Sequence, residues 1–151
     1  MSDLQAIADR VEIEALRSEF TDAGMMRDYD RFASVFAPDG AWRMPHIGIS
    51  FVGREDIRAG IENLQTRWDY FVQTIHPGAV QIDGDTATGR TYVEEFGRSR
   101  DGGSYLNYAL YHDRYRRTGD GWKFAERRYE IRYLDTTPLT GTAPSSRSDH
   151  A

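Results

Sequence analysis

The chain has 151 residues, a net charge of −5 and no cysteine. A chain of this length favours one domain that buries roughly 70% of the surface exposed by its unfolded form. The acidic balance gives no electrostatic basis for binding nucleic acid or an anionic membrane, and the lack of cysteine excludes disulfides and thiolate chemistry. The opening run MSDLQAIADR is too polar for a signal peptide, so we expect a cytoplasmic protein with no nucleic-acid or membrane partner.

Three helices are predicted in the first half of the chain. Apolar residues at helical spacing, with charges between them, indicate an amphipathic helix over about residues 3–24, opened by a capping box at its first residues. The segment DYDRFASVF predicts a shorter helix, and the following APDG is typical of a turn that ends it. After a short strand at AWRM, the segment GREDIRAGIENLQTRW predicts a third helix with acidic residues in its first turn.

From about residue 70 the apolar period changes to two, which is typical of strands. DGD, RSRDGG and TGDG are turn signals between them. The predicted strands are Phe71–His76, Ala79–Asp83, Thr86–Phe96, Tyr105–Arg116 and Trp122–Leu134. Long strands joined by hairpins form a sheet that twists and curls. The order therefore predicts an α+β domain over residues 1–135, with helices closing a curled antiparallel or mixed sheet, and a tail over 136–151 that is flexible or docked.

Two strands carry faces that suit the inside of a curled sheet. In Thr86–Phe96, one face is small and apolar apart from Glu95. In Tyr105–Arg116, the face with Asn107 and Tyr111 mixes small residues with hydrogen-bonding ones. We expect these faces to border a pocket at the mouth of a cone. The opposite face of the second strand is also partly apolar, which predicts a homodimer or homotrimer.

Few side chains suit chemistry in such a pocket. His76 ends the apolar run FVQTIH, and Pro77 favours an extended backbone at His76. An imidazole can transfer protons near neutral pH, although a structural role is the alternative. Asp22 lies near the end of the first helix, and Arg128 either binds substrate or pairs with a nearby acid. The four histidines are scattered without metal-ligand spacing, and no cofactor motif is present, so we expect neither metal nor cofactor.

Four segments carry a resemblance to a known family: FTDAGMMRDYDRFASVFAPDGAW, VGREDIRAGI, QTIHPGAV and YHDRYRRTGDGWKFAERRY. In this order they resemble the SnoaL-like branch of the nuclear transport factor 2-like superfamily, which includes scytalone dehydratase and hexachlorocyclohexane dehydrochlorinase. The resemblance implies a cone-shaped α+β barrel with His76 in its pocket, oriented by an Asp on the first helix. Met25 stands at that Asp position here, so we hypothesise that Glu95 or Asp22 takes its role.

The predicted function is a cofactor-independent lyase or isomerase, dehydratase- or dehydrohalogenase-like, acting on a small apolar or aromatic molecule. His76 would transfer the proton, with Glu95 or Asp22 orienting it. The expected substrate-binding residues are Trp42, Met25, Tyr111, Asn107 and Arg128. The alternatives are a non-catalytic ligand-binding or assembly domain and a small accessory subunit of an oxygenase.

Overall fold

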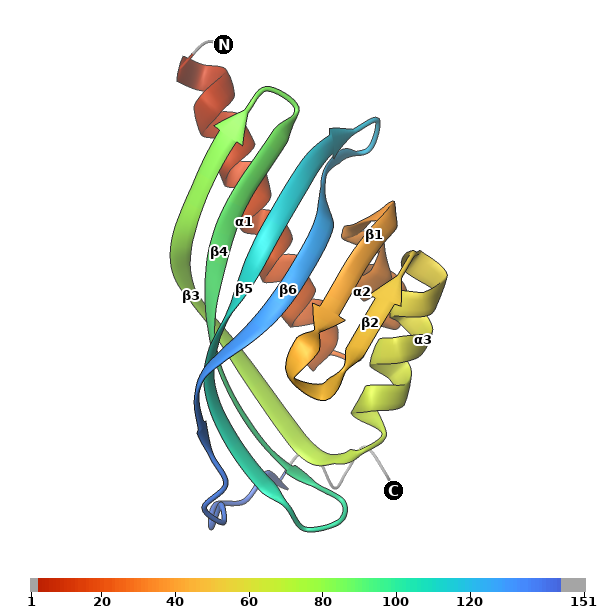
Figure 1. Cartoon of the computed structure of the whole chain (residues 1–151), viewed down its shortest axis with the longest axis vertical. Coiled ribbons are helices and arrows are strands. Elements are labelled where there is room, and N and C mark those ends of the chain that lie inside the picture. Colours follow the sequence, from red (N-terminus) through yellow and green to blue (C-terminus); the bar gives the residue numbers. More distant parts are fainter. Residues whose placement is uncertain (1–2, 145–151) are drawn as a thin grey trace.

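The structure is a computed structural model that describes residues 3–144. Its elements are α1 (Asp3–Met25), α2 (Tyr29–Ser34), β1 (Phe36–Met44), the 3-10 helix η1 (Pro45–Ile47), β2 (Ile49–Val52), α3 (Arg54–Gln65), β3 (Trp68–Asp83), β4 (Thr86–Ser99), β5 (Ser104–Thr118) and β6 (Gly121–Asp135). The strands form one sheet in the order β2-β1-β6-β5-β4-β3. The predicted α+β class with a curled sheet is confirmed, and the sheet is open rather than closed (Figure 1). None of the described helices is long and apolar enough to cross a membrane.

The sheet is mixed because of its first strand. β1 runs parallel to β6, whereas every other neighbouring pair is antiparallel. The predicted APDG turn is wrong, since these residues lie inside β1, where they form the irregularity between Phe36 and Ala41 in the pairing with β6. β2 was not predicted, and it pairs with the end of β1. Backbone pairing to neighbours far along the chain thus overrides a local turn signal here.

β3 is one strand where two were predicted. It runs through Pro77 because a bulge between His76 and Ala79 absorbs the proline and the glycine after it. A Cβ added at Gly78 would lie 1.7 Å from the backbone oxygen of Arg90, so this close approach of β3 to β4 requires glycine. The bulge also resets which side chains face inward along the second half of the strand.

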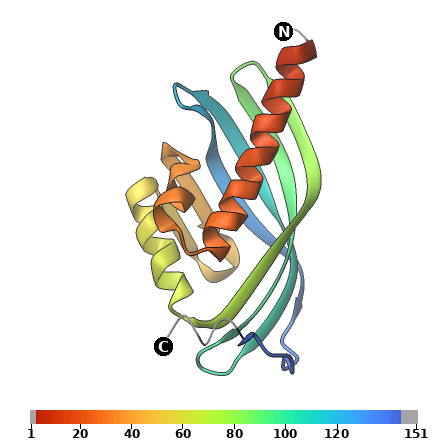
Figure 2. The same cartoon turned by 180° about the vertical axis from the view of Figure 1, so that it is seen from behind.

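Helix α1 covers the inner face of the sheet, with α2 and α3 beside it (Figure 2). Ile13, Leu16 and Phe20 place its apolar stripe in the core. The core also holds a completely buried ion pair, in which the Arg127 Nε donates to the Asp113 Oδ1 at 2.7 Å. The Arg127 guanidinium lies 4.0 Å from the centre of the Tyr111 ring, so this pair supports a residue of the site described below.

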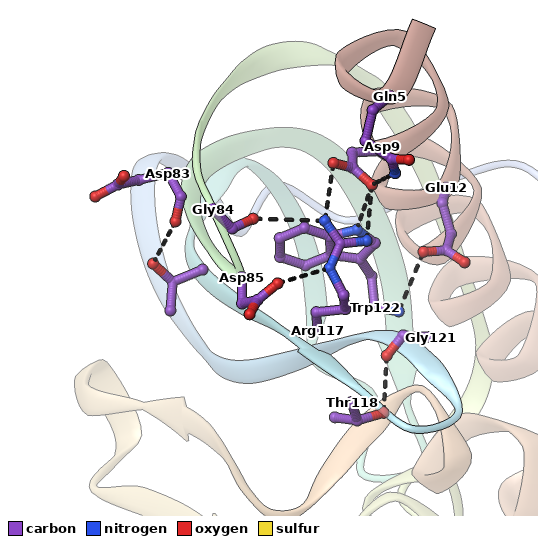
Figure 3. A network of polar contacts seen from close by, with 11 residues as sticks. Gln5, Asp9, Glu12, Asp83, Gly84, Asp85, Arg117, Thr118, Gly121 and Trp122 are labelled. Carbon is purple, nitrogen blue, oxygen red and sulfur yellow. Dashed lines mark hydrogen bonds and ion pairs between the residues drawn. The ribbon is translucent and has the colours of Figure 1, made fainter. Parts of the chain in front are cut away.

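The beginning of α1 is fixed to the far end of the sheet by Asp9 (Figure 3). Its two carboxylate oxygens each accept from Arg117 at 2.9 Å, and the Trp122 Nε1 donates to it at 3.1 Å. Arg117 also pairs with Asp85 in the β3–β4 turn. The hydrogen bond from Arg117 is the largest cause that lowers the pKa of Asp9 well below its usual range. Asp9 therefore joins the helix to the β5–β6 hairpin, and Arg117 extends this link to the β3–β4 turn.

Candidate functional site

A cavity of about 670 Å³ lies between the helices and the half of the sheet that contains the start of β3 and the end of β4. The end of α1, β1, α3 and the four long strands all contribute to its wall, which is mainly apolar and aromatic. Phe20, Trp42, Trp68, Phe71, Tyr105 and Ile131 are among the apolar and aromatic residues of this wall. Its size and lining suit a small organic molecule.

The carboxylate of Glu95 is the buried charged group that lines this cavity. Gln73 Nε2 donates to its Oε2 at 3.0 Å, and Asn107 Nδ2 donates to its Oε1 at 3.2 Å. The Tyr129 hydroxyl is also hydrogen-bonded to Oε1. A buried carboxylate needs such donors to offset the loss of water. The three donors come from β3, β5 and β6, so the sheet fixes the orientation of Glu95.

Helix α1 reaches the same network through Gln73. The Thr21 hydroxyl donates to the Gln73 Oε1 at 2.8 Å, which fixes the amide so that its nitrogen faces Glu95. The backbone N–H of Gln73 donates to the Met25 sulfur at 3.2 Å. Met25 lines the cavity, as predicted, and is an apolar side chain next to the polar network of Gln73 and Glu95.

Tyr111 supplies a second polar group. Its hydroxyl accepts from the Trp42 Nε1 at 3.2 Å, and none of the described residues accepts its proton. Burial, followed by the charge of Glu95, raises the pKa of Tyr111, so the hydroxyl keeps its proton at neutral pH. The buried Oδ1 of Asn107 also has no hydrogen-bond partner among residues 3–144. Two wall residues therefore carry unused hydrogen-bonding capacity among the described residues, the Tyr111 hydroxyl as a donor and the Asn107 Oδ1 as an acceptor.

His46 is the histidine that lines the cavity within the described part of the chain. It lies in η1, between β1 and β2, with its ring centre 5.2 Å from that of Tyr129. Burial lowers the pKa of His46, and the nearby charge of Glu95 partly offsets this effect. The imidazole is therefore neutral at pH 7. His46 was not predicted as a site residue, because no motif surrounds it in the sequence.

The prediction that His76 lies in the pocket is wrong. Its side chain is 53% exposed, does not line the cavity and has Glu94 as its ionic neighbour, with Nε2 3.9 Å from Oε2. Side chains alternate along a strand, so Gln73 and Ile75 facing inward place His76 on the outer face. The structure therefore does not bring His76 and Glu95 together.

Two further candidates lie away from the cavity. Asp22 accepts from Arg31 at 2.5 Å on the outer side of α1, and its side chain is 57% exposed. Arg128 is exposed and lies opposite His112 on the outer face of the sheet. Both placements contradict the predicted roles. By contrast, the cavity wall contains Glu95, Trp42, Met25, Tyr111 and Asn107, as predicted.

No group of three or more potential metal ligands occurs among the described residues. The polar groups around Glu95 are amides and a phenol, which are donors to a carboxylate rather than a set of anionic metal ligands. The arrangement is suited to holding one carboxylate ready for proton transfer.

Comparison with known sequences identifies the family to which this fold and cavity belong. Residues 5–128 match the SnoaL-like domain, and the chain belongs to that family. A curated relative, the gamma-hexachlorocyclohexane dehydrochlorinase of Sphingobium indicum, is 32% identical over 146 residues, which cover 93% of this chain and 90% of the relative.

Solved structures agree with this assignment. A hexachlorocyclohexane dehydrochlorinase of type 2 superposes with a TM-score of 0.84 at 26% identity, covering 93% of this chain and 95% of that one. The type 3 enzyme from Novosphingobium barchaimii gives a TM-score of 0.83 at 28% identity, with 93% and 97% covered. These proteins are what the chain is similar to in both sequence and fold.

Gln73, Tyr129 and Thr21 belong to the site but were not predicted from the sequence. Gln73 lies in the run FVQTI, where Phe71 and Ile75 share its parity, and that alternation was the available signal. Thr21 precedes Asp22, and Asp22 was predicted as the site residue although Thr21 is the one that contacts Gln73. Tyr129 follows two arginines near the end of the chain, and no local pattern connects it to Glu95.

Proposed function

We propose that the protein is a cofactor-independent lyase that removes a proton from carbon and eliminates a neighbouring leaving group. Glu95 is the general base in this proposal. The observation that carries it is a carboxylate that lines an apolar cavity of about 670 Å³ and is held by three donors. The similarity to a dehydrochlorinase supports the reaction class. The substrate is a small, largely apolar or aromatic molecule, as the lining favours.

The proposed step balances without any cofactor. The Glu95 carboxylate takes a proton from a C–H group, and the electron pair of that bond forms a C=C bond with the adjacent carbon. The leaving group departs from the adjacent carbon with its bonding electrons, as chloride or, after gaining a proton, as water. Gln73 and Asn107 donate to Glu95 before and during the step, so they position the base and are not proton carriers themselves.

Tyr111 is suited to receive the leaving group. Its proton has no acceptor among the described residues, and Tyr111 lines the cavity beside Trp42. A hydroxyl can donate to departing chloride or hydroxide in a site that excludes water. Neutral His46 beside Tyr129 offers a route for the proton on Glu95 to return to solvent. The catalytic residues proposed are therefore Glu95 and Tyr111, not His76.

The test is elimination by the purified protein. Chlorinated cyclohexanes, including γ-hexachlorocyclohexane, are followed by chloride release, and cyclic β-hydroxyketones are followed by the absorbance of the conjugated enone. We expect turnover in one of these series, and we expect Glu95→Gln to lower kcat at least about 100-fold with an unchanged melting temperature. Equal kcat for Glu95→Gln and the wild type would contradict the proposal.

A non-catalytic binding domain is the second candidate. It is favoured by the network itself, because the hydrogen bonds from Gln73, Asn107 and Tyr129 would equally hold a carboxylate that has a purely structural role. Molecules of the two series that bind in the calorimeter but are never converted would identify this function. Conversion by the wild type excludes it.

We also propose that the chain assembles with further copies of itself through the outer face of the sheet. Tyr92, Tyr108 and Tyr133 expose 43%, 48% and 57% of their surface there. The same face carries both charge signs, including the His112–Glu130 pair at 2.8 Å. Light scattering after gel filtration is expected to give the mass of a dimer or trimer, and a mass near 17.3 kDa would contradict it.

A further inference from the structure

We propose that the substrate is an organic acid, and that Arg67 and Arg100 at the rim of the cavity bind its anionic group. This inference rests on the proposed function for the reaction at Glu95, but it concerns binding alone. It predicts a substrate class that differs from the neutral chlorinated molecule named for the relatives. The charged group and the reactive C–H bond lie at opposite ends of an apolar body.

The two arginines come from different parts of the chain and are held together by the backbone. The N–H of Arg100 donates to the carbonyl of Arg67 at 2.9 Å, which joins the end of the β4–β5 hairpin to the turn between α3 and β3. Both residues line the cavity. Trp68 and Tyr105 beside them form an edge-to-face pair with ring centres 5.8 Å apart, so the rim combines cations with aromatic surface.

Neither guanidinium has an ionic or hydrogen-bond partner among residues 3–144. This distinguishes them from Arg98 near the end of β4, which pairs with Asp69 at 3.2 Å and lies over the Tyr70 ring. Several other arginines of the described chain are unpaired too, but Arg67 and Arg100 are the two that line this cavity. In a chain with a net charge of −5, an unpaired cationic pair at a cavity mouth is well placed to attract an anion.

One acidic residue at the rim opposes the positive charge of the two arginines. Asp101 also lines the cavity, but its carboxylate is already bonded by the Ser99 hydroxyl and by the Gly103 N–H at 2.9 Å. The Ser99 hydrogen bond is the main cause that lowers the pKa of Asp101, so it is ionised at neutral pH. Two cations and one engaged carboxylate leave the rim with a net positive charge.

The position of Glu95 excludes an anionic group from the other end of the cavity. Glu95 lies four residues before Ser99, the last residue of β4, a separation of roughly 13 Å at about 3.3 Å per residue, and Arg100 follows in the turn. A carboxylate placed near Glu95 would meet its like charge in a poorly solvated site, whereas at the rim it meets two guanidinium groups. The charge arrangement therefore orients an acid with its apolar body toward Glu95.

The experiment compares acids with their neutral amides by calorimetry. The probes are benzoate and benzamide, cinnamate and cinnamamide, and 2-naphthoate and 2-naphthamide, each with matched shape. We expect the wild type to bind at least one acid about tenfold more tightly than its amide, and we expect added salt to reduce this preference. Arg67→Met/Arg100→Met should remove the preference, whereas Arg98→Met, which breaks a pair outside the cavity, should keep it.

The inference is overturned if acids and amides bind equally, if no acid of the series binds, or if the double variant keeps the preference. Its failure is distinguishable from failure of the proposed function. Glu95→Gln should keep or strengthen the acid preference while turnover is lost. Turnover without any acid preference would refute the anion site alone. An acid preference without turnover of any elimination substrate, neutral or carboxylated, would refute the lyase alone.

Discussion

The buried pair of Arg127 and Asp113 is expected to be strongly coupled, so that removing one partner costs far more than removing both. Asp113 accepts from Arg127 at 2.7 and 3.1 Å, and the hydroxyls of Thr91 and Tyr115 each donate to it at 2.7 Å. Arg127 is packed between Phe20, Tyr111 and Phe124. Asp113→Leu leaves this guanidinium buried with no counter-charge.

The magnitude follows from the burial of both partners. Removing one member of a buried pair costs about 3–5 kcal/mol, which for a chain of this size lowers the melting temperature by roughly 10 °C. Asp113→Leu/Arg127→Met removes both charges and leaves mainly the two hydroxyls without an acceptor, at about 1 kcal/mol each. We therefore expect the double variant to be more stable than either single one.

Urea unfolding of the wild type, the two single variants and the double variant measures this coupling. A double variant within about 2 kcal/mol of the wild type would agree with the reasoning. Additive losses would refute it, since they would mean that neither charge depends on the other. The Arg127→Met variant should also alter ligand binding, because Arg127 packs against Tyr111 at the cavity wall.

Three further predictions follow from the fold. Gly78→Ala should lower stability by roughly 2–3 kcal/mol, because the added Cβ meets the Arg90 carbonyl. Gly119→Ala, with open space around it, should change stability by less than about 0.5 kcal/mol. Equal urea midpoints for the two variants would contradict this. Asp9→Asn should lower the urea midpoint at pH 7. Because folding lowers the pKa of Asp9, its contribution to stability is fully present above the unfolded pKa of 3.8 and fades as pH falls toward the folded pKa. The urea midpoints of the wild type and the variant should therefore converge below about pH 3.8. A difference in midpoint that stays constant down to about pH 2 would be inconsistent with this role. Thr21→Val should leave the melting temperature nearly unchanged but lower kcat, since Gln73 loses the hydrogen bond that orients its amide toward Glu95, and an unchanged kcat would show that the amide needs no such support.

Much of the fold could be predicted because local and long-range signals agree. The glycine turns between the long strands lie where the sequence indicated, and Gly84, Gly102 and Gly121 all take positive φ there. The face of β4 that carries Val93 and Glu95 is the buried one, as its small residues predicted. β1 was one of the exceptions, because a buried strand with a turn-like sequence is stabilised by partners that no local window contains.

The site was predicted in part, and the error at His76 has a physical cause. The run FVQTIH carries apolar residues at both parities, so alternation alone did not decide which side faces the core. The resemblance then favoured His76 over Gln73. Glu95 and Tyr111 were found because each stands out as polar on a face of small residues. The donors that hold Glu95 come from three strands, and their convergence depends on register, which the sequence does not state.

The most direct test of the account is to measure kcat for Glu95→Gln and His76→Asn side by side, on whichever elimination substrate the wild type converts, with melting temperatures as folding controls. The account predicts a loss of at least about 100-fold for Glu95→Gln and a change of less than about threefold for His76→Asn. A large loss for His76→Asn with activity retained in Glu95→Gln would contradict the assignment of the base and return the chemistry to the outer face of β3.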